Sequence, residues 1–360
     1  MKTVQRSTLN VQRSITFCVE SWTLNVERCR QIVTTPQNVH AFHRSLLRWY
    51  RRHGRALPWR QTRNPYAILV SEFMLQQTQV AAVIPYYNEW LCRFPDFAAL
   101  ARAPESDILH AWQGLGYYAR ARNLHAVAKI VQRRHRGRFP RNLAAICALP
   151  GIGRYTANAI ATFAFDQPVP IVETNTARVL TRLFDFRSSI DRVAGREYLW
   201  ERARALVPKH PGRIYNSALV DLGALVCLPR QPKCRICPVK KFCRAKDPET
   251  LPIKKARPPT VRLTENHAFI ARQKTILLEQ ANHRWRGMWI LPPLQSRATR
   301  RQPAYRSIFP FTNHSVTLNV YALPRQKIDN HSQRWIRIDS LESIPIPSPH
   351  RRALQILLRA

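Results

Sequence analysis

Four cysteines near the middle of the chain stand close enough in sequence to surround one metal centre. They are Cys227, Cys234, Cys237 and Cys243, separated by six, two and five residues. Because thiolates bind soft and borderline metals, the set predicts either a zinc ion or an iron–sulfur cluster. Charged residues in and beside this loop are mostly basic, so the metal would shape a surface suited to phosphate.

A second chemical motif is the segment LPGIG, which carries Gly151 and Gly153 between two apolar helical stretches. Glycines are expected where the backbone needs a positive φ or a close approach. Free amides at the start of the following helix would suit a phosphate oxygen. The segment therefore predicts a DNA-binding helix-hairpin-helix turn, with an ordinary interhelical turn as the alternative.

The charge of the chain agrees with a polyanionic partner. Lys and Arg number 58 against 21 Asp and Glu, a formal net charge of +37. Such an excess favours nucleic acid, and arginine grips phosphate through two-point contacts. No apolar run approaches the roughly 18 residues of a membrane span, so we expect no membrane partner. The clustered cysteines favour a reducing compartment over disulfides.

A largely helical domain must position these residues, and we expect it over residues 39–245. Apolar residues recur at helical spacing from Val39 onward, while strand-like alternation is nearly absent up to Cys243. One expected helical stretch runs over residues 64–94, and others flank the LPGIG segment. The fold class predicted for this part is mainly α.

The pattern changes on both sides of this domain. Residues 246–261 are rich in proline and charge and predict a linker. Residues 262–360 contain short alternating segments, such as TILLEQ and SVTLNVYAL, closed by a helical HRRALQILLR, so we expect a small α+β domain. Residues 1–38 carry a near-repeat, STLNVQRS and WTLNVERC, without a helical apolar stripe. We interpret them as a disordered or misassigned extension.

These segments together resemble the MutY adenine glycosylases of the endonuclease III superfamily, from about Phe42 to the C-terminus. The strongest matches are SEFMLQQTQVAAVIPYY, WQGLGYYARARNLH, LPGIGRYTANAIA and the cysteine set. The resemblance implies a multidomain protein, with a mainly α helix-hairpin-helix glycosylase domain and a Nudix-like α+β domain. It also implies a [4Fe–4S] cluster on the four cysteines, where spacing alone leaves zinc open.

The resemblance places a catalytic acid at Glu72. Protonating N7 makes adenine a feasible leaving group, and apolar neighbours such as Phe73 are expected to raise the pKa of Glu72. The family aspartate that stabilises the oxocarbenium-like sugar corresponds to Glu173, whose extra methylene lengthens its reach. A carboxylate that only caps a helix is the alternative for Glu173. Asn175 resembles a family asparagine that helps to orient the site.

Tyr155 occupies the position at which bifunctional members of the superfamily carry a lysine. That lysine forms a Schiff base with the sugar and then cuts the strand. Because a phenol cannot form an imine, we expect base removal without efficient strand cleavage. A packing aromatic beside the turn is the alternative for Tyr155.

Reaching a base inside a duplex requires extrusion and a side chain that fills the gap. By resemblance, Gln77 and Tyr117 are expected to enter the base stack, and Leu115 lies beside Tyr117 as a further DNA contact. Arg120 and Arg122 are expected to meet phosphates. Solvent-exposed or packing roles are the alternatives.

The segment HRWRGMWILPP resembles part of a Nudix domain. No Asp or Glu occurs between Leu294 and Phe311, so we expect no metal-dependent pyrophosphohydrolysis. In the family the equivalent domain recognises 8-oxoguanine through a Phe-Ser-His loop, and Thr312, Asn313 and His314 stand in its place here. Ordinary hairpin residues are the alternative.

The resemblance therefore predicts a monomeric, monofunctional adenine glycosylase of base excision repair. Its expected partner is double-stranded DNA with 8-oxoguanine·adenine or guanine·adenine mispairs, and its expected location is the bacterial cytoplasm, associated with the nucleoid. One alternative is an endonuclease III-like glycosylase for oxidised pyrimidines, which Tyr155 and the C-terminal domain disfavour. Another is a catalytically silent binder of damaged DNA, which the departure at Glu173 suggests.

Overall fold

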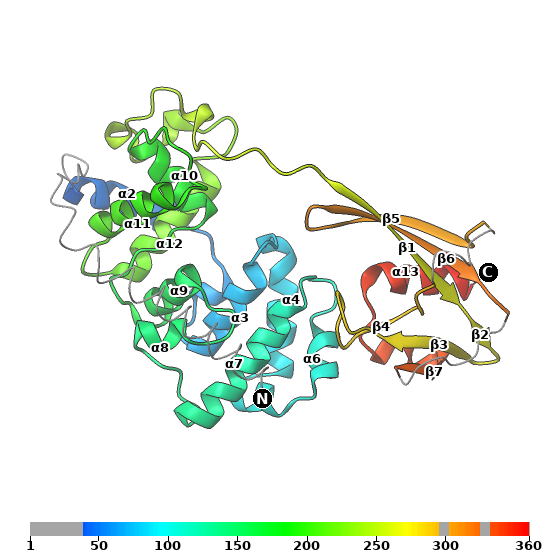
Figure 1. The fold of residues 1–360 in the computed structure, drawn as a ribbon. Coiled ribbons are helices and arrows are strands. Elements are labelled where there is room, and N and C mark those ends of the chain that lie inside the picture. Colours follow the sequence, from blue (N-terminus) through cyan, green and yellow to red (C-terminus); the bar gives the residue numbers. More distant parts are fainter. Residues whose placement is uncertain (1–38, 295–301, 325–331, 360) are drawn as a thin grey trace. The chain divides into compact units, whose positions relative to one another are not determined.

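The structure is a computed structural model, and it describes residues 39–294, 302–324 and 332–359 (Figure 1). The predicted extension, residues 1–38, lies outside the described residues. Among the helices of the described part, none is long and apolar enough to cross a membrane.

The described chain forms two compact units. The first contains residues up to Gln76 together with residues 130–256, and the second contains residues 77–129 together with residues 257–360. The predicted helical domain thus contributes to both units. Helix α7 (Ala119–His135) contains the point at which the chain passes from the second unit into the first.

The first unit is helical. Its α-helices are α2 (Val39–His53), α3 (Pro65–Leu75), α8 (Leu143–Cys147), α9 (Arg154–Phe165), α10 (Thr174–Leu183), α11 (Val193–Leu206) and α12 (Gly212–Leu225). Short 3-10 turns are η1 (Pro58–Arg60), η2 (Cys234–Ile236), η3 (Lys240–Phe242) and η4 (Pro248–Thr250).

Helix α3 begins at a strong start signal and is a core helix. The side chain of Asn64 accepts a hydrogen bond from the amide of Tyr66 at 2.9 Å, and Pro65 has no amide hydrogen to leave unpaired at the first position. The residues from Tyr66 to Met74 are all buried. Helix α3 packs on α9, which is also mostly buried. These two helices carry Glu72 and Tyr155 into the interior.

The helical stretch expected over residues 64–94 is interrupted. Helix α3 ends at Leu75 and α4 (Val80–Arg93) begins five residues later along the chain. Gln76 is extended, with ψ of 111°, and Gln77 has a left-handed φ of 57°. A left-handed conformation costs a non-glycine residue about 1–2 kcal/mol, so surrounding contacts must hold this break. It leaves Gln77 exposed.

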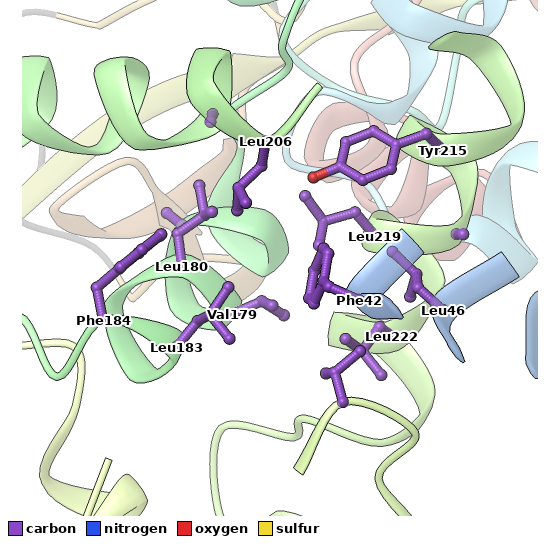
Figure 2. Packing of buried hydrophobic residues seen from close by; sticks show 14 of the residues in the cluster. Phe42, Leu46, Val179, Leu180, Leu183, Phe184, Leu206, Tyr215, Leu219 and Leu222 are labelled. Carbon is purple, nitrogen blue, oxygen red and sulfur yellow. The ribbon is translucent and has the colours of Figure 1, made fainter. Parts of the chain in front are cut away.

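One hydrophobic core of the first unit is formed by apolar side chains from α2, α10, α11 and α12 (Figure 2). It gathers Phe42 of α2, Leu180 of α10 and Leu219 of α12, each almost fully buried. Cys227 and Cys237 pack against the same cluster. The core therefore supports the loop that carries the four cysteines.

The helical part of the second unit contains four helices and a buried pair of tryptophans. The helices are α4, α5 (Phe97–Arg102), α6 (Glu105–Ala111) and the first part of α7. Trp90 and Trp112 are almost fully buried and meet edge to face, with ring centroids 5.3 Å apart. Such pairs contribute about 0.5–1.5 kcal/mol beyond their buried area. Trp112 lies two residues before Gly114, and its Nε1 donates to the carbonyl of Gly116 at 3.0 Å, so the pair anchors the segment that carries Tyr117.

The C-terminal part of the second unit is a small α+β region. One sheet has the strand order β1 (Val261–Phe269), β6 (His314–Ala322), β5 (Tyr305–Phe311), with β1 parallel and β5 antiparallel to β6. In the other sheet, β3 (Thr275–Gln280) pairs antiparallel with β2 (Ala271–Arg272), β4 (Trp289–Ile290) and β7 (Gln333–Arg337). The turn η6 (Ile338–Ser343) and helix α13 (Ser348–Leu357) follow.

Strand β6 shows why this region folds as a sheet. Val316, Leu318 and Val320 are buried, and the residues between them are half-buried. This period-two pattern places one apolar face toward the core. The alternation predicted from the sequence is thus present in the structure.

Candidate active site

Glu72 is a carboxylic acid in an apolar interior. It lies on α3 between Ser71 and Phe73 and is 5% exposed. Burial is the largest cause that raises the pKa of Glu72, to about 7, and the nearby charge of Glu173 raises it further. A hydrogen bond from Tyr155 and the charge of Arg60 act in the opposite direction. Glu72 can therefore hold a proton near neutral pH.

Tyr155 is the second residue of α9 and donates its hydroxyl hydrogen to Glu72. Burial, followed by the charges of Glu72 and Glu173, raises the pKa of Tyr155 well above its ordinary value. The phenol therefore stays protonated across the physiological range. It can donate a hydrogen bond but is not a nucleophile.

Glu173 caps helix α10 with both of its carboxylate oxygens. Oε2 accepts from the amide of Asn175 and Oε1 from the amide of Thr176, each at 2.8 Å. The amide of Glu173 in turn donates to the Thr176 hydroxyl at 2.8 Å. Burial raises the pKa of Glu173, while these amide bonds and the charges of Arg178 and Arg55 oppose the rise. Glu173 therefore caps the helix, as the alternative interpretation predicted, and it also lies close enough to Glu72 to affect the pKa of that residue.

Asn175 connects this helix end to the cysteine loop. Its Oδ1 accepts from Nη2 of Arg178 at 2.9 Å, and the same guanidinium donates to the carbonyl of Cys227 at 2.7 Å. A Cβ atom at Gly223 would lie 2.7–3.0 Å from Asn175 atoms. Only glycine allows α12 to approach α10 this closely.

A buried ion-pair cluster lies beside the two carboxyl groups. Asp221 of α12 is fully buried and accepts from Arg55 and Arg60, with the shortest contacts at 2.6 Å. Burial alone would raise the pKa of Asp221, but the hydrogen bonds and charge of Arg60, with those of Arg55, leave it below its ordinary value. Arg60 lies close enough to Glu72, and Arg55 close enough to Glu173, for their charges to lower the pKa of those carboxyl groups.

The four cysteines gather in the loop that follows α12. Burial, and then the thiols of the other three cysteines, raise the pKa of Cys237 to about 11. Within the described part of the chain, no three His, Cys, Asp or Glu side chains are placed to hold one metal ion. Four thiols gathered in one loop are donors that suit a soft or borderline metal centre.

Arg182 ties the cysteine loop to α10. Its side chain is 1% exposed and donates to the carbonyls of Leu228, Pro229 and Leu251 at 2.6–3.1 Å. Nη1 also lies 3.3 Å from Sγ of Cys227, and the thiol of Cys243 donates to the carbonyl of Arg182 at 3.3 Å. The loop is thus fixed at several points by one buried cation.

The predicted helix-hairpin-helix turn is present between α8 and α9. Gly151 has a φ of 72°, the left-handed conformation that the sequence predicted. The same expectation is wrong for Gly153, whose φ is −89° and which has no described atom within 4 Å of a Cβ built there. Gly153 is exposed and caps α9. An absent side chain here leaves the first amides of α9 accessible.

Three residues expected to contact DNA lie in the second unit. Gln77 and Tyr117 both have left-handed backbones, with φ of 57° and 49°. Tyr117 is 41% exposed, whereas Leu115 is 7% exposed and therefore mostly buried. The expectation for Arg120 is wrong, because this side chain is 6% exposed and donates to the carbonyls of Leu115 and Gly116.

Thr312 and Asn313 form the turn between β5 and β6, and His314 is the first residue of β6. Thr312 and Asn313 are exposed, and Thr312 has a left-handed φ of 53°. The carbonyl of Asn313 accepts from the amide of Val261 at 2.9 Å, which holds the turn against β1. Among the described residues, Nδ1 of His314 is buried without a hydrogen-bond partner.

The comparisons with known proteins agree with this geometry. The HhH-GPD family model, described as a superfamily of base excision DNA repair proteins, matches residues 70–205. The adenine DNA glycosylase of Mycobacterium tuberculosis is 40% identical over 208 residues, which cover 58% of this chain and 68% of that protein. The chain belongs to the adenine DNA glycosylases. The resemblance predicted from the sequence motifs is confirmed.

Two further members of the family differ in how much of their length is matched. The adenine DNA glycosylase of Buchnera aphidicola subsp. Baizongia pistaciae is 43% identical, over 57% of this chain and 58% of that protein. That of subsp. Schizaphis graminum is 29% identical, over 88% of this chain and 99% of that protein. Identity is thus higher in the matches that cover only part of the chain.

A solved structure supports the fold of the glycosylase part. A thermostable thymine-DNA glycosylase is 34% identical, with a TM-score of 0.53, over 57% of this chain and 94% of that chain. The predicted fold class, a helix-hairpin-helix glycosylase domain with a separate α+β region, is confirmed.

The sequence did not single out Arg55, Arg60 and Asp221, or the buried Arg178 and Arg182. One signal was available for Asp221, since a lone acid in the apolar stretch ALVDLGAL needs a buried partner. The arginines carried no such signal, because in a chain this basic each one is expected to be on the surface. Their burial becomes apparent only when distant segments pack.

Proposed function

We propose that this chain is a monofunctional adenine DNA glycosylase that acts on adenine opposite 8-oxoguanine or guanine in double-stranded DNA. It hydrolyses the bond between the base and the deoxyribose and leaves the strand intact. The protein acts on chromosomal DNA in the cytoplasm, and one copy suffices.

The observation that carries the proposal is the state of Glu72. Its pKa of about 7, caused mainly by burial, means that a large fraction of Glu72 is protonated at neutral pH. A general acid works best when its pKa lies near the working pH. Glu72 donates this proton to N7 of the extruded adenine, which makes the base a competent leaving group.

Glu173 stabilises the sugar as the base departs. The anomeric carbon becomes oxocarbenium-like, and a carboxylate fixed in place lowers the energy of that charge. The two amide bonds at 2.8 Å hold Glu173 in one orientation, so no reorganisation is required during the reaction. Asn175 supports this end of α10, and a water molecule completes hydrolysis at the sugar.

Tyr155 accounts for the absence of strand cleavage. Its hydroxyl is hydrogen-bonded to Glu72 and its pKa is far above neutrality. A phenol has no amine with which to form a Schiff base. The role of Tyr155 is to orient Glu72, and alkali or a separate lyase is needed to break the strand.

A [4Fe–4S] cluster held by Cys227, Cys234, Cys237 and Cys243 supplies no step of this reaction. When bound, it crosslinks the loop through iron–thiolate bonds and fixes its basic surface. Lys240 and Lys241 are exposed on this loop, where they can contact phosphates. Arg178 and Arg182 join the loop to α10 and thus to Glu173.

The remaining roles concern the duplex. The amides of α9 behind Gly151 and Gly153 bind a phosphate, and Gln77 and Tyr117 enter the stack at the vacated position, with Leu115 beneath them. Thr312, Asn313 and His314 read the base opposite adenine. The exposure of Gln77, Tyr117, Thr312 and Asn313 supports these roles.

Single-turnover base release on an 8-oxoguanine·adenine duplex tests the proposal. Wild-type protein should release adenine, and strand breaks should appear only after alkali treatment. Glu72→Gln should lower the rate at least a hundredfold, as expected for loss of a general acid. Equal rates for wild type and Glu72→Gln would contradict the proposed mechanism.

The same assay separates the alternatives. Duplexes with guanine·adenine, guanine·thymine and an oxidised pyrimidine are run in parallel, because one structural relative is a thymine-DNA glycosylase. Release of thymine or an oxidised pyrimidine without release of adenine would replace the proposed substrate. Tight binding without release of any base would indicate a silent damage binder.

A further inference from the structure

The segment Gly114–Tyr118 contains three residues with positive φ, and for one of them, Tyr117, this conformation is unfavourable. Gly114, Gly116 and Tyr117 have φ values of 102°, 69° and 49°. A non-glycine residue such as Tyr117 keeps a left-handed backbone only when its surroundings impose it. Strain of this kind clusters where a side chain must be presented in one orientation.

Two side chains impose this conformation from within the helical part of the second unit. Nε1 of Trp112 donates to the carbonyl of Gly116 at 3.0 Å, and Nη2 of Arg120 donates to that of Leu115 at 2.9 Å. The guanidinium of Arg120 also lies over the Tyr117 ring, 5.5 Å from its centroid. Contacts with Trp112 and Arg120 therefore hold the backbone of the segment Gly114–Tyr118 in place.

A third support comes from the C-terminal region of the same unit. Nη2 of Arg351, on α13, donates to Oε1 of Gln113 at 3.2 Å, and Gln113 directly precedes Gly114. The same nitrogen lies within 3.2 Å of the carbonyls of Leu341 and Ile344. Arg351 is thus fixed by two backbone carbonyls of the C-terminal region and, at the same time, hydrogen-bonds Gln113. Its charge also acts on Tyr118.

Further contacts lie on both sides of Gln113. His110 on α6 is hydrogen-bonded to the carbonyl of Glu342 at 2.8 Å, and Arg122 on α7 donates to the carbonyl of Arg286 at 2.9 Å. A Cβ atom at Gly287 would lie 3.2 Å from Leu109. The C-terminal region therefore flanks the segment Gly114–Tyr118 at both of its ends.

We infer that Arg351 is a positioning residue that couples the C-terminal region to the placement of Tyr117. This inference rests on the proposed function, in which the turn residues Thr312 and Asn313, with His314 at the start of β6, read the opposite base. When that turn engages 8-oxoguanine, Arg351 and Gln113 transmit the fixed position of the region to the strained segment. Tyr117 is then held ready to enter the stack only when the correct opposite base is bound.

Single-turnover rates on 8-oxoguanine·adenine and guanine·adenine duplexes test the coupling. Arg351→Met should lower the rate on the 8-oxoguanine duplex about tenfold, the value of one charge-assisted hydrogen bond, with less than about a twofold change on the guanine duplex. Gln113→Ala should do the same and leaves α13 intact. The double variant should be no slower than either single variant, and Arg351→Lys should recover part of the loss.

Arg352→Met is the matched control, because Arg352 is the exposed neighbour of Arg351 on α13. It should leave both rates unchanged. Equal losses on the two duplexes, or additive losses in the double variant, would overturn the inference. If Arg351→Met does not fold, Gln113→Ala decides alone. A wild type that releases no adenine from either duplex would instead refute the proposed function.

Discussion

At the scale of single residues, Glu72 shows how a fold sets the protonation of an acid. A glutamate in water has a pKa near 4.5 and would be ionised at neutral pH. Placing Glu72 on a helix that is buried on all sides raises its pKa to about 7. The hydrogen bond from Tyr155 keeps the rise within a useful range.

This placement should reduce the stability of the protein. The folded pKa of Glu72 lies above its unfolded value of 4.5, so the folded state binds the proton more tightly. Stability therefore falls as pH rises from about 4.5 to 7, by an amount of the order of 3 kcal/mol. Glutamine does not titrate, so Glu72→Gln should be more stable than wild type at pH 8 and should lose this advantage at pH 4.5.

Urea unfolding of both proteins at the two pH values measures this difference. The wild type serves as its own control, because only the pH dependence of the stability difference is attributed to Glu72. A difference of the same size at both pH values would show that Glu72 is not the titrating group.

Two substitutions at Glu173 test separately the charge of its side chain and the length of its side chain. Glu173→Asp keeps a carboxylate and a good helix cap, so we expect its single-turnover rate to remain within about tenfold of wild type. Glu173→Gln keeps the length but removes the charge, and we expect a loss of about a hundredfold. Rates on the 8-oxoguanine·adenine duplex check both, and similar rates in all three proteins would exclude a charge role.

At the scale of elements, the loop after α2 and helix α12 are joined by Asp221. Removing one partner of a buried ion pair leaves uncompensated charge and typically costs about 3–5 kcal/mol. Asp221→Asn should therefore destabilise the protein by roughly this amount, because Arg55 and Arg60 lose their buried partner. Chemical unfolding measures it.

Asp185→Asn is the comparison variant for Asp221. Asp185 forms an ion pair with Arg187, whose side chain is half exposed, and surface pairs contribute little. A loss of stability in Asp185→Asn as large as that in Asp221→Asn would contradict the role assigned to burial.

Much of the element pattern could be predicted from the sequence. The apolar periodicity of α9 and the LPGIG turn are local, and so is the alternation of β6. The break at Gln76–Gln79 was not predicted, because apolar residues continue on both sides and no glycine or proline marks it. Strand β5 was missed as well, since its alternation is weak and it contains Pro310, which is tolerated only where no ladder hydrogen bond is needed.

The candidate site also contains residues that could be predicted from the sequence and contacts that could not. Glu72, Tyr155, Glu173 and Asn175 lie in recognisable segments, and the structure places them on helices that pack in one unit. The pairs that Asp221 makes join residues more than 160 positions apart, and no local pattern encodes them. The burial of Arg120 was unpredictable for the same reason.

At the scale of the whole molecule, the net charge of +37 is expected to determine the affinity for DNA and its dependence on salt. Binding to undamaged duplex should be mainly electrostatic and should release counterions. We expect the affinity to fall by about a thousandfold or more between 50 and 200 mM salt, as for proteins that contact 6–10 phosphates. Fluorescence anisotropy with an unmodified duplex measures the slope, and an affinity independent of salt would contradict the assignment.

The two units divide the residues proposed to act on the duplex. Glu72, Tyr155 and Glu173 belong to the first unit, whereas Gln77 and Tyr117 belong to the second. Base extrusion and proton transfer are therefore assigned to different parts of the chain. In the proposed mechanism, the chemistry depends on the protonated carboxyl group of Glu72.

The pH dependence of single-turnover adenine release tests this dependence most directly. The rate on an 8-oxoguanine·adenine duplex should be constant below the pKa of Glu72, about 7, and should fall toward tenfold per pH unit above it, because only the protonated acid donates. Tyr155→Phe should move this fall to higher pH, since it removes the bond that lowers the pKa. A rate that does not change from pH 6 to 9 in either protein would contradict proton donation by Glu72.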